Sequence, residues 1–97
     1  MTESTIRIIE VIKAIPRGKV LSYRDVALAA GLPNGARQTV WVLHSLSDKF
    51  DLPWHRVIRS NGTIALKEGR DLQIQLLRSE GVIVSSNGKV ELKGPGS

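Results

Sequence analysis

The stretch KVLSYRDVALAAGLPNGARQTVWVLHSL, residues 19 to 46, decides the fold of this 97-residue chain. Ser22 stands three residues before Asp25, which is the spacing of an N-terminal capping box, and small apolar residues follow at helical intervals. We therefore expect a helix over roughly Tyr23 to Ala30, with the next glycine as the left-handed residue that ends it. After the turn residues LPNG, a second helix is expected over Ala36 to Leu46. Two helices joined by a short glycine-containing turn form a helix-turn-helix, whose second helix commonly enters a DNA groove.

The segments on either side complete a small, mainly helical domain. Upstream, apolar residues within Ser4 to Ile15 recur at the spacing of an amphipathic helix, which a proline and a glycine then end. Downstream, β-prone runs flank Asn61-Gly62 and Asn87-Gly88, which are strong hairpin signals, and a last helix is expected between them from Asp71. The sequence thus predicts a mainly α, winged helix-turn-helix fold, with a three-helix DNA-binding core, a small β-hairpin wing, and a C-terminal helix and hairpin.

The composition favours a soluble protein that binds polyanions. Fourteen Lys and Arg against nine Asp and Glu leave a net charge of +5, so nucleic acid is the first partner to consider and anionic lipid the second. At this length we expect one domain over residues 1–92 and a flexible tail over 93–97. No apolar run approaches a membrane span and the N-terminus does not resemble a signal peptide, so we expect a cytoplasmic protein, nucleoid-associated when bound to DNA, without a membrane partner. We also expect a monomer.

The chain contains no cysteine, which excludes disulfides, thiolate nucleophiles and zinc sites built on sulfur. Its two histidines, His44 and His55, are too few and too far apart in sequence to indicate a metal site by spacing. We therefore expect neither a metal nor a cofactor.

Four segments, IPRGKVLSYRDVA, GARQ, LPWHRVIRSNGTI and LLRSEGV, resemble the DNA-binding domain of the O6-alkylguanine-DNA alkyltransferases over roughly Ile15 to Val82. In those enzymes the central motif is Pro-Cys-His-Arg-Val, and its cysteine accepts the alkyl group from the damaged base. Here the same frame, Pro53 to Val57, has Trp54 at the acceptor position. An indole N–H only donates, so it cannot replace the thiolate as a nucleophile.

This resemblance implies an alkyltransferase-like protein rather than an enzyme. Such a protein binds O6-alkylguanine in double-stranded DNA without alkyl transfer and directs the lesion to nucleotide excision repair. The resemblance also implies that the recognition helix docks in the minor groove and that the damaged nucleotide is flipped out of the duplex.

The resemblance assigns roles to individual residues. Tyr23 matches the tyrosine that presses on the phosphate of the flipped nucleotide, and Arg37 matches the arginine that fills the gap left in the duplex. Guanidinium is planar and stacks on bases, which suits that task. Ala36 and Gln38, on either side of Arg37, are assigned to the same DNA- and lesion-binding set. Trp54 is expected to line the pocket for the alkylated base, because a flipped base needs an aromatic-lined site.

Two further groups of residues differ from the enzymes in their surroundings or in the task that is left to them. The loop TIALKEGRDL departs from the Tyr-Ser-Gly-Gly pattern of the enzymes, and either Lys67 or Arg70 could lie over the guanine face in a cation–π contact. His55 and Glu80 match members of the relay that deprotonates the acceptor cysteine. Because the thiol is gone, we expect both to persist as structural hydrogen-bonding groups, with Arg56 supporting the loop.

The recognition helix and its surroundings also depart from the enzymes. Val40 and Trp41 occupy positions where the enzymes usually have glycines, which let the helix approach the DNA closely, so Trp41 is expected to affect docking. Leu46 replaces the asparagine that braces the site in the enzymes, which is consistent with a site no longer tuned for thiolate chemistry.

Two other functions fit parts of the sequence. A winged-helix transcriptional regulator that binds a specific DNA sequence would share the helix-turn-helix and the basic charge. A repair hydrolase could use His55 and Glu80. The segment PWHRV favours lesion binding over the regulator, because a regulator would not need it.

Overall fold

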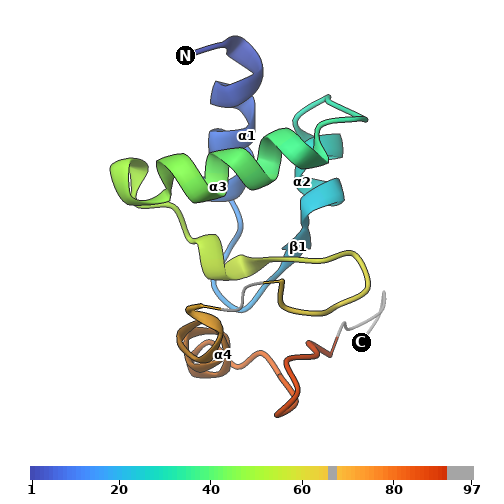
Figure 1. Ribbon diagram of the computed structural model, residues 1–97, viewed down its shortest axis with the longest axis vertical. Helices are drawn as coiled ribbons and strands as arrows, with labels where there is room; N and C mark the ends of the chain where they lie inside the picture. The colour runs from blue at the N-terminus through green and yellow to red at the C-terminus, as the bar shows by residue number, and fades with distance from the viewer. Residues whose placement is uncertain (66–67, 92–97) are drawn as a thin grey trace.

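The computed structural model describes residues 1–65 and 68–91 of the chain. Its elements are helix α1 (Glu3–Lys13), strand β1 (Leu21–Ser22), helices α2 (Tyr23–Ala29) and α3 (Ala36–Phe50), the short 3-10 helix η1 (Trp54–Arg56), strand β2 (Val57–Ile58) and helix α4 (Arg70–Ser79). Helices α1, α2 and α3 pack into one unit, and α4 lies at the other end of the molecule, next to the C-terminal segment (Figure 1). In the described part of the chain, no helix is long and apolar enough to span a membrane.

The helix-turn-helix forms where its local signals predict it. The Ser22 hydroxyl accepts a hydrogen bond from the Asp25 backbone N–H at 3.0 Å, which caps α2. Gly31 follows α2 with φ of +77°, the left-handed conformation expected of it. A side chain at Gly35 would lie 2.8 Å from the Leu32 Cβ, so the turn into α3 requires a glycine there. The helix-turn-helix predicted from the sequence is therefore confirmed.

Helix α3 continues beyond its predicted end at Leu46. It runs to Phe50 and stops at Asp51, which adopts a left-handed conformation with φ of 50°. Leu46 and Phe50 both pack against the core shared with α1 and α2. This packing stabilises the additional turn, although the polar residues after Leu46 predict an earlier end.

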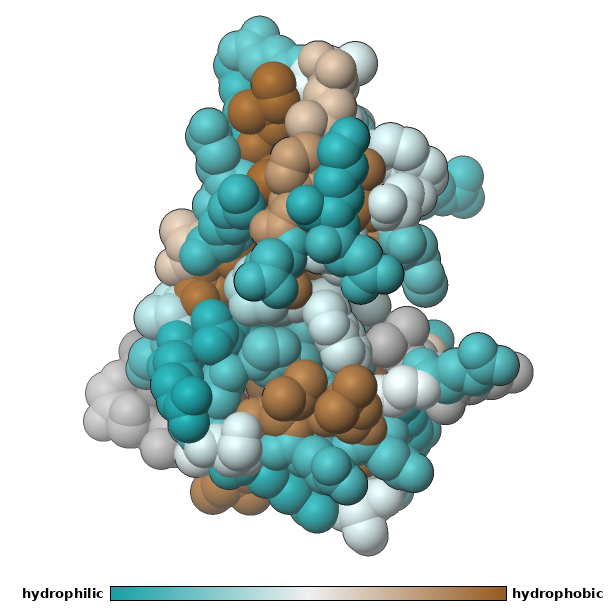
Figure 2. Space-filling model, turned by 90° about the vertical axis from the view of Figure 1, so that its left-hand side faces the viewer, coloured by the Kyte–Doolittle hydropathy of each residue, from teal (hydrophilic) through white to brown (hydrophobic). Residues whose placement is uncertain are grey.

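Two buried clusters form the core. The first lies among α1, α2 and α3 and contains Ile8, Ile9, Ile12, Ile15, Val26, Ala30, Val42, Leu52 and Val57. The second lies under α4 and contains Ile58, Ile64, Ile74, Leu77, Val84 and Val90. The adjacent residues of β2 belong to different clusters, so this strand joins the two halves of the domain. Figure 2 shows one side of the molecule, which is mostly hydrophilic with apolar side chains gathered in a few places.

The predicted wing is a tight turn rather than a two-stranded hairpin. The Arg59 N–H donates to the Thr63 carbonyl at 3.0 Å, but β2 pairs in parallel with β1, and Thr63 bridges to Lys89. Because Val57 and Ile58 are both about 1% exposed, β2 is covered on both faces and pairs inside the molecule instead of across the turn.

The second predicted hairpin, around Asn87-Gly88, does form. Val84 lies opposite Val90 in an antiparallel bridge, and the Ser85 N–H donates to the Lys89 carbonyl at 2.9 Å. The fold is therefore mainly α, with the predicted three-helix core, last helix and C-terminal hairpin, and with a shorter wing than the sequence indicated.

Candidate nucleic-acid interface

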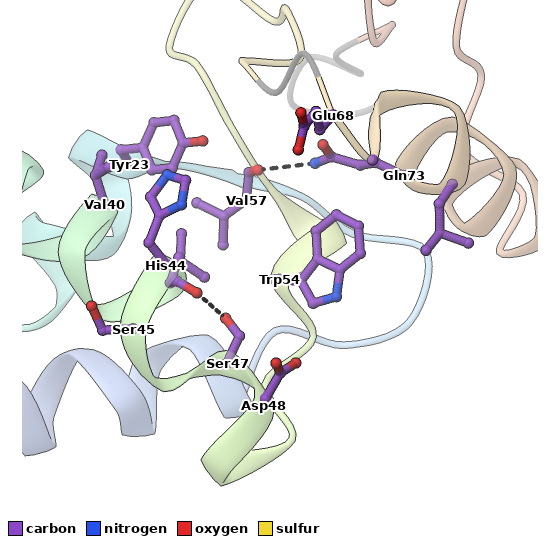
Figure 3. Close-up of a pocket in the computed structure, with 13 residues that line it drawn as sticks. Tyr23, Val40, His44, Ser45, Ser47, Asp48, Trp54, Val57, Glu68 and Gln73 are labelled. Atoms are coloured by element: carbon purple, nitrogen blue, oxygen red, sulfur yellow. Dashed lines mark hydrogen bonds between the residues drawn. The ribbon is translucent and has the colours of Figure 1, made fainter.

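A pocket of about 280 Å³ lies between the start of α2, the middle of α3, η1 and the start of α4. Tyr23 and His44 stand on one side of it and Trp54 on the other (Figure 3). Its lining residues are Tyr23, Val40, Leu43, His44, Ser45, Ser47, Asp48, Trp54, Val57, Glu68, Gly69, Leu72 and Gln73. Ligand pockets begin at about 300 Å³, so this pocket lies at the small end of the range, and its aromatic walls suit a flat ligand such as one nucleobase.

Trp54 reaches the pocket because η1 turns the chain just after Pro53. The indole is partly buried, and its ring meets the His55 ring edge to face, with centroids 6.1 Å apart and an interplanar angle of 87°. The sequence predicts Trp54 in the wall of a pocket, and the structure places it there. Contact with an alkylated base remains a prediction.

Tyr23 stands at the first position of α2, where its half-buried ring forms the opposite wall. Burial raises the pKa of the Tyr23 phenol, and the nearby positive charge of Arg59 opposes this effect in part. The hydroxyl is therefore neutral at physiological pH. A neutral hydroxyl can donate a hydrogen bond to a phosphate without charge repulsion, as the role assigned to Tyr23 requires.

Arg37 lies in the first turn of α3 and is exposed to solvent. The exposed Trp41 and His44 follow it at intervals of four and three residues, so the three share one face of the helix. Ala36 is partly buried beside Arg37. The same helix therefore presents a cation and an indole outward, while Val40 lines the pocket.

Gln38 has a partner inside the protein. Its amide nitrogen donates to the Ser4 hydroxyl at 2.9 Å and to the Thr5 hydroxyl at 3.2 Å, which ties α3 to α1. The predicted DNA contact of Gln38 would use other atoms of the residue or require these hydrogen bonds to break.

His55, Arg56 and Glu80 meet in one buried cluster. The Glu80 carboxylate accepts hydrogen bonds from Arg56 Nη2 at 2.8 Å, His55 Nε2 at 2.7 Å and the Gly18 N–H at 2.9 Å. Arg56 Nη1 also donates to the Ile15 carbonyl at 2.9 Å. The cluster therefore ties η1 to the end of α4 and to the segment before β1.

The hydrogen bonds from Arg56 are the main reason that the pKa of Glu80 falls to about 2, and they outweigh the opposing effect of burial. The Gly18 N–H and His55 add to the decrease. Because the carboxylate is ionised at neutral pH and only accepts, the proton of the short contact with His55 lies on Nε2.

The loop before α4 differs in detail from the prediction. Arg70 donates a hydrogen bond to the Asn87 carbonyl, so its guanidinium lies at the C-terminal hairpin, and the residues that line the pocket here are Glu68 and Gly69. A lesion contact by Arg70 would require it to leave Asn87. The other predicted cation, Lys67, lies outside the described residues.

Gln73 is a pocket residue that the sequence analysis missed. It lies on the buried stripe of α4 with Ile74 and Leu77 and is only 2% exposed. A polar residue in an otherwise apolar helical stripe is the signal that could have identified it. Among the described residues, no group of histidines and carboxylates is arranged to hold a metal ion.

Comparisons with known proteins agree on one family. Residues 3–82 match the family described as 6-O-methylguanine DNA methyltransferase, DNA binding domain. The DNA base-flipping protein of Escherichia coli (strain K12) is 47% identical over 89 residues, which cover 90% of this chain and 68% of that protein. Alkyltransferase-like protein 1 of Schizosaccharomyces pombe is 35% identical over 100 residues, covering 98% and 93%. The crystal structure of S. pombe Atl1 in complex with damaged DNA containing O6-carboxymethylguanine matches with a TM-score of 0.78 and 34% identity, over 96% of this chain and 91% of that one.

Proposed function

This chain belongs to the family of the 6-O-methylguanine DNA methyltransferase DNA-binding domain, and from that premise we propose that it recognises O6-alkylguanine in duplex DNA without transferring the alkyl group. One observation carries the proposal: Trp54 lines a base-sized pocket at the position where the methyltransferase frame holds its cysteine, in a chain that has no cysteine. The E. coli relative named for base flipping and the S. pombe structure that contains a damaged guanine support it.

In this proposal α3 docks in the minor groove and the damaged nucleotide rotates into the pocket. Removing a base from the stack costs a few kcal/mol, which contacts with the extruded base and with the remaining gap must offset. Arg37 stacks in the gap, Tyr23 holds the phosphate of the flipped nucleotide, and Trp54 packs against the base. Two observations support these assignments: Arg37 is exposed on α3, and Tyr23 and Trp54 lie on opposite walls of the pocket.

Selectivity arises after flipping. The minor groove gives a degenerate pattern of donors and acceptors, so docking of α3 tolerates many sequences, and phosphate contacts from a chain of charge +5 add sequence-independent affinity. An O6-alkyl group weakens base pairing and adds apolar surface, and burying each methylene stabilises the complex by about 0.8 kcal/mol. The pocket therefore prefers the alkylated base over guanine.

The bound complex would then direct the lesion to nucleotide excision repair. A protein that flips a base from the minor groove commonly bends the duplex, which gives repair proteins a distinctive surface to recognise. We propose that the chain acts in this way as a monomer in the cytoplasm, on the DNA of the cell.

A competition titration at fixed salt concentration tests the proposed function. Two duplexes that differ only in one guanine or O6-methylguanine compete for the protein, and mass spectrometry then measures the methyl group on the DNA. We expect preferential binding of the methylated duplex with its methyl group retained. Equal binding of the two duplexes would contradict lesion recognition, and strong preference for one undamaged sequence would favour a transcriptional regulator.

A further inference from the structure

The outer face of α3 carries an exposed indole. Trp41 is 54% exposed and belongs to neither buried cluster of the described chain. Among the large apolar side chains that the described residues expose, it is the only aromatic one. A single exposed apolar residue is ordinary on a protein surface, but the position of Trp41 between two proposed DNA contacts is not.

Trp41 stands in the middle of a row of exposed side chains. Arg37 lies four residues before it and His44 three residues after it, on the same face of α3. Arg37 is assigned to the gap in the duplex, and His44 lines the pocket on the side of Tyr23 (Figure 3). A duplex that contacts both ends of this row must pass over Trp41. The helical rise puts Trp41 about 6 Å from Arg37 along the helix axis, which is one or two base steps of about 3.4 Å.

The size of the Trp41 side chain limits how α3 can dock. By resemblance it stands where the alkyltransferases usually have a glycine, which lets the helix approach DNA closely. A helix with its side chains is about 10 Å across and an undistorted minor groove is about 6 Å wide, so α3 already needs a widened groove. An indole that held α3 farther out would keep Arg37 from the gap and the flipped base from the pocket. Because an indole is planar and stacks on bases, its insertion between two base pairs lets α3 keep both contacts.

We propose that Trp41 inserts between two base pairs beside the gap that Arg37 fills, and that this second wedge makes lesion binding depend on the flanking sequence. This role rests on the proposed function and lies outside the pocket. Apolar wedges that enter from the minor groove partly unstack a base step and kink the duplex. Unstacking costs least at pyrimidine–purine steps such as TA and CA. A lesion beside such a step is therefore bound more tightly than the same lesion in a stiff A-tract, although no base edge is read there.

Four duplexes of equal composition in the flanks measure this dependence. Each holds either guanine or O6-methylguanine, and the two base pairs on each side form either a TA step or an AA step. Dissociation constants are measured at one salt concentration for the unmodified chain, Trp41→Ala, Trp41→Phe and Ile83→Ala, with thermal unfolding as a check on folding. Ile83 is 56% exposed and follows α4, which lies at the other end of the molecule (Figure 1), so Ile83→Ala is a matched loss of exposed apolar surface.

For the unmodified chain we expect O6-methylguanine to bind about tenfold more tightly between TA steps than between AA steps. Flexible neighbours also ease the flipping of the damaged nucleotide, so part of this ratio persists without Trp41. Trp41→Ala should reduce the ratio to about threefold or less. Trp41→Phe keeps a planar ring and should retain most of the ratio, and Ile83→Ala should retain all of it.

The emission of Trp41 shows whether its ring stacks on bases. A Trp54→Phe variant leaves Trp41 as the single tryptophan, and saturating DNA should then remove most of the emission through stacking. An indole that lay along the sugars of the groove would instead shift its emission to shorter wavelength and keep most of its intensity.

Three results would contradict the wedge. An unchanged ratio in Trp41→Ala would show that the flanking sequence acts without Trp41. Tighter binding of every duplex by Trp41→Ala, at the same ratio, would show that the indole only obstructs docking. Retained Trp41 emission in the complex would place the ring along the groove. Lesion recognition survives each of these results while O6-methylguanine is preferred over guanine; without that preference in either flank, the proposed function fails and the role of Trp41 fails with it.

Discussion

Replacing Glu80 by glutamine should destabilise the fold by about 3 kcal/mol at neutral pH, close to the value for breaking a buried ion pair. The Glu80 side chain is only 5% exposed, and its two oxygens together accept hydrogen bonds from Arg56, His55 and Gly18. Glutamine has nearly the same shape, but it carries no charge and has one acceptor oxygen instead of two. Arg56, itself 17% exposed, would then lie buried without its anion.

The magnitude follows from the titration of the carboxyl group. The pKa of Glu80 falls from 4.5 to about 2 on folding, mainly through Arg56, and this difference corresponds to about 3 kcal/mol. Because the folded pKa is the lower one, the unfolded chain takes up the proton first as the pH falls. The stabilisation is therefore complete above about pH 5 and is lost as the pH falls through 4.5 toward 2.

Urea denaturation at pH 7, 4.5 and 2.5, followed by circular dichroism, measures both effects. The unmodified chain should lose stability steeply over this range, and the Glu80→Gln variant should lose less, because it lacks the group that titrates. Glu10→Gln, at an exposed position of α1, is the matched control and should change stability by less than about 0.5 kcal/mol. A loss below about 1 kcal/mol for Glu80→Gln at pH 7, or an unchanged pH dependence, would show that the cluster does not hold the fold as argued.

Three further predictions concern DNA binding. Trp41 is 54% exposed on the outer face of α3, and a Trp54→Phe variant leaves its fluorescence as the single tryptophan signal. Binding to any duplex should protect Trp41 from quenching by acrylamide. Unchanged quenching in the complex would show that Trp41 does not lie in the DNA interface. Arg37→Ala should weaken binding to an O6-methylguanine duplex about tenfold or more in gel-shift titrations, and Arg37→Lys should restore little of this loss. The control, Arg7→Ala at an exposed position of α1, should have a small effect. Equal losses for Arg37→Ala and Arg7→Ala would indicate a general effect of charge. Trp54→Cys should accept little or no methyl group from O6-methylguanine by mass spectrometry of the protein, since Leu46 and the altered loop leave the thiolate poorly supported; stoichiometric transfer would contradict this.

The parts of the fold that depend on local signals could be predicted from the sequence. The Ser22 cap and the left-handed Gly31 define α2 without reference to the rest of the chain. The end of α3 could not be predicted in this way, because Phe50 remains helical through contacts with a core built from other segments. The partner of β2 depends on contacts with residues more than 30 positions away, where turn residues give no information.

The candidate site also combines features that the sequence predicts with features that depend on contacts between distant residues. Trp54 and the cluster around Glu80 follow from a motif, because the frame of residues around the lost cysteine is intact. The direction of Arg70 is set by the Asn87 carbonyl, and that of the Gln73 amide by the His55 and Val57 carbonyls, to which its nitrogen donates. Neither set of hydrogen bonds could be predicted from a sequence pattern.

The Glu80 cluster has a structural task that does not depend on a thiol, because its hydrogen bonds connect segments that are distant in the sequence. One carboxylate joins the Gly18 N–H, 62 positions earlier in the chain, to the two residues that follow Trp54. Arg56 extends the connection to the Ile15 carbonyl. The backbone that carries the indole is thus tied at two points to the segment between α1 and β1. In an alkyltransferase frame the same geometry would place a thiolate; here it fixes the pocket wall that Trp54 forms, against which the flipped base would pack in the proposed function. Loss of Glu80 should therefore reduce lesion preference more than general DNA affinity, since the exposed cations of the surface do not depend on the cluster.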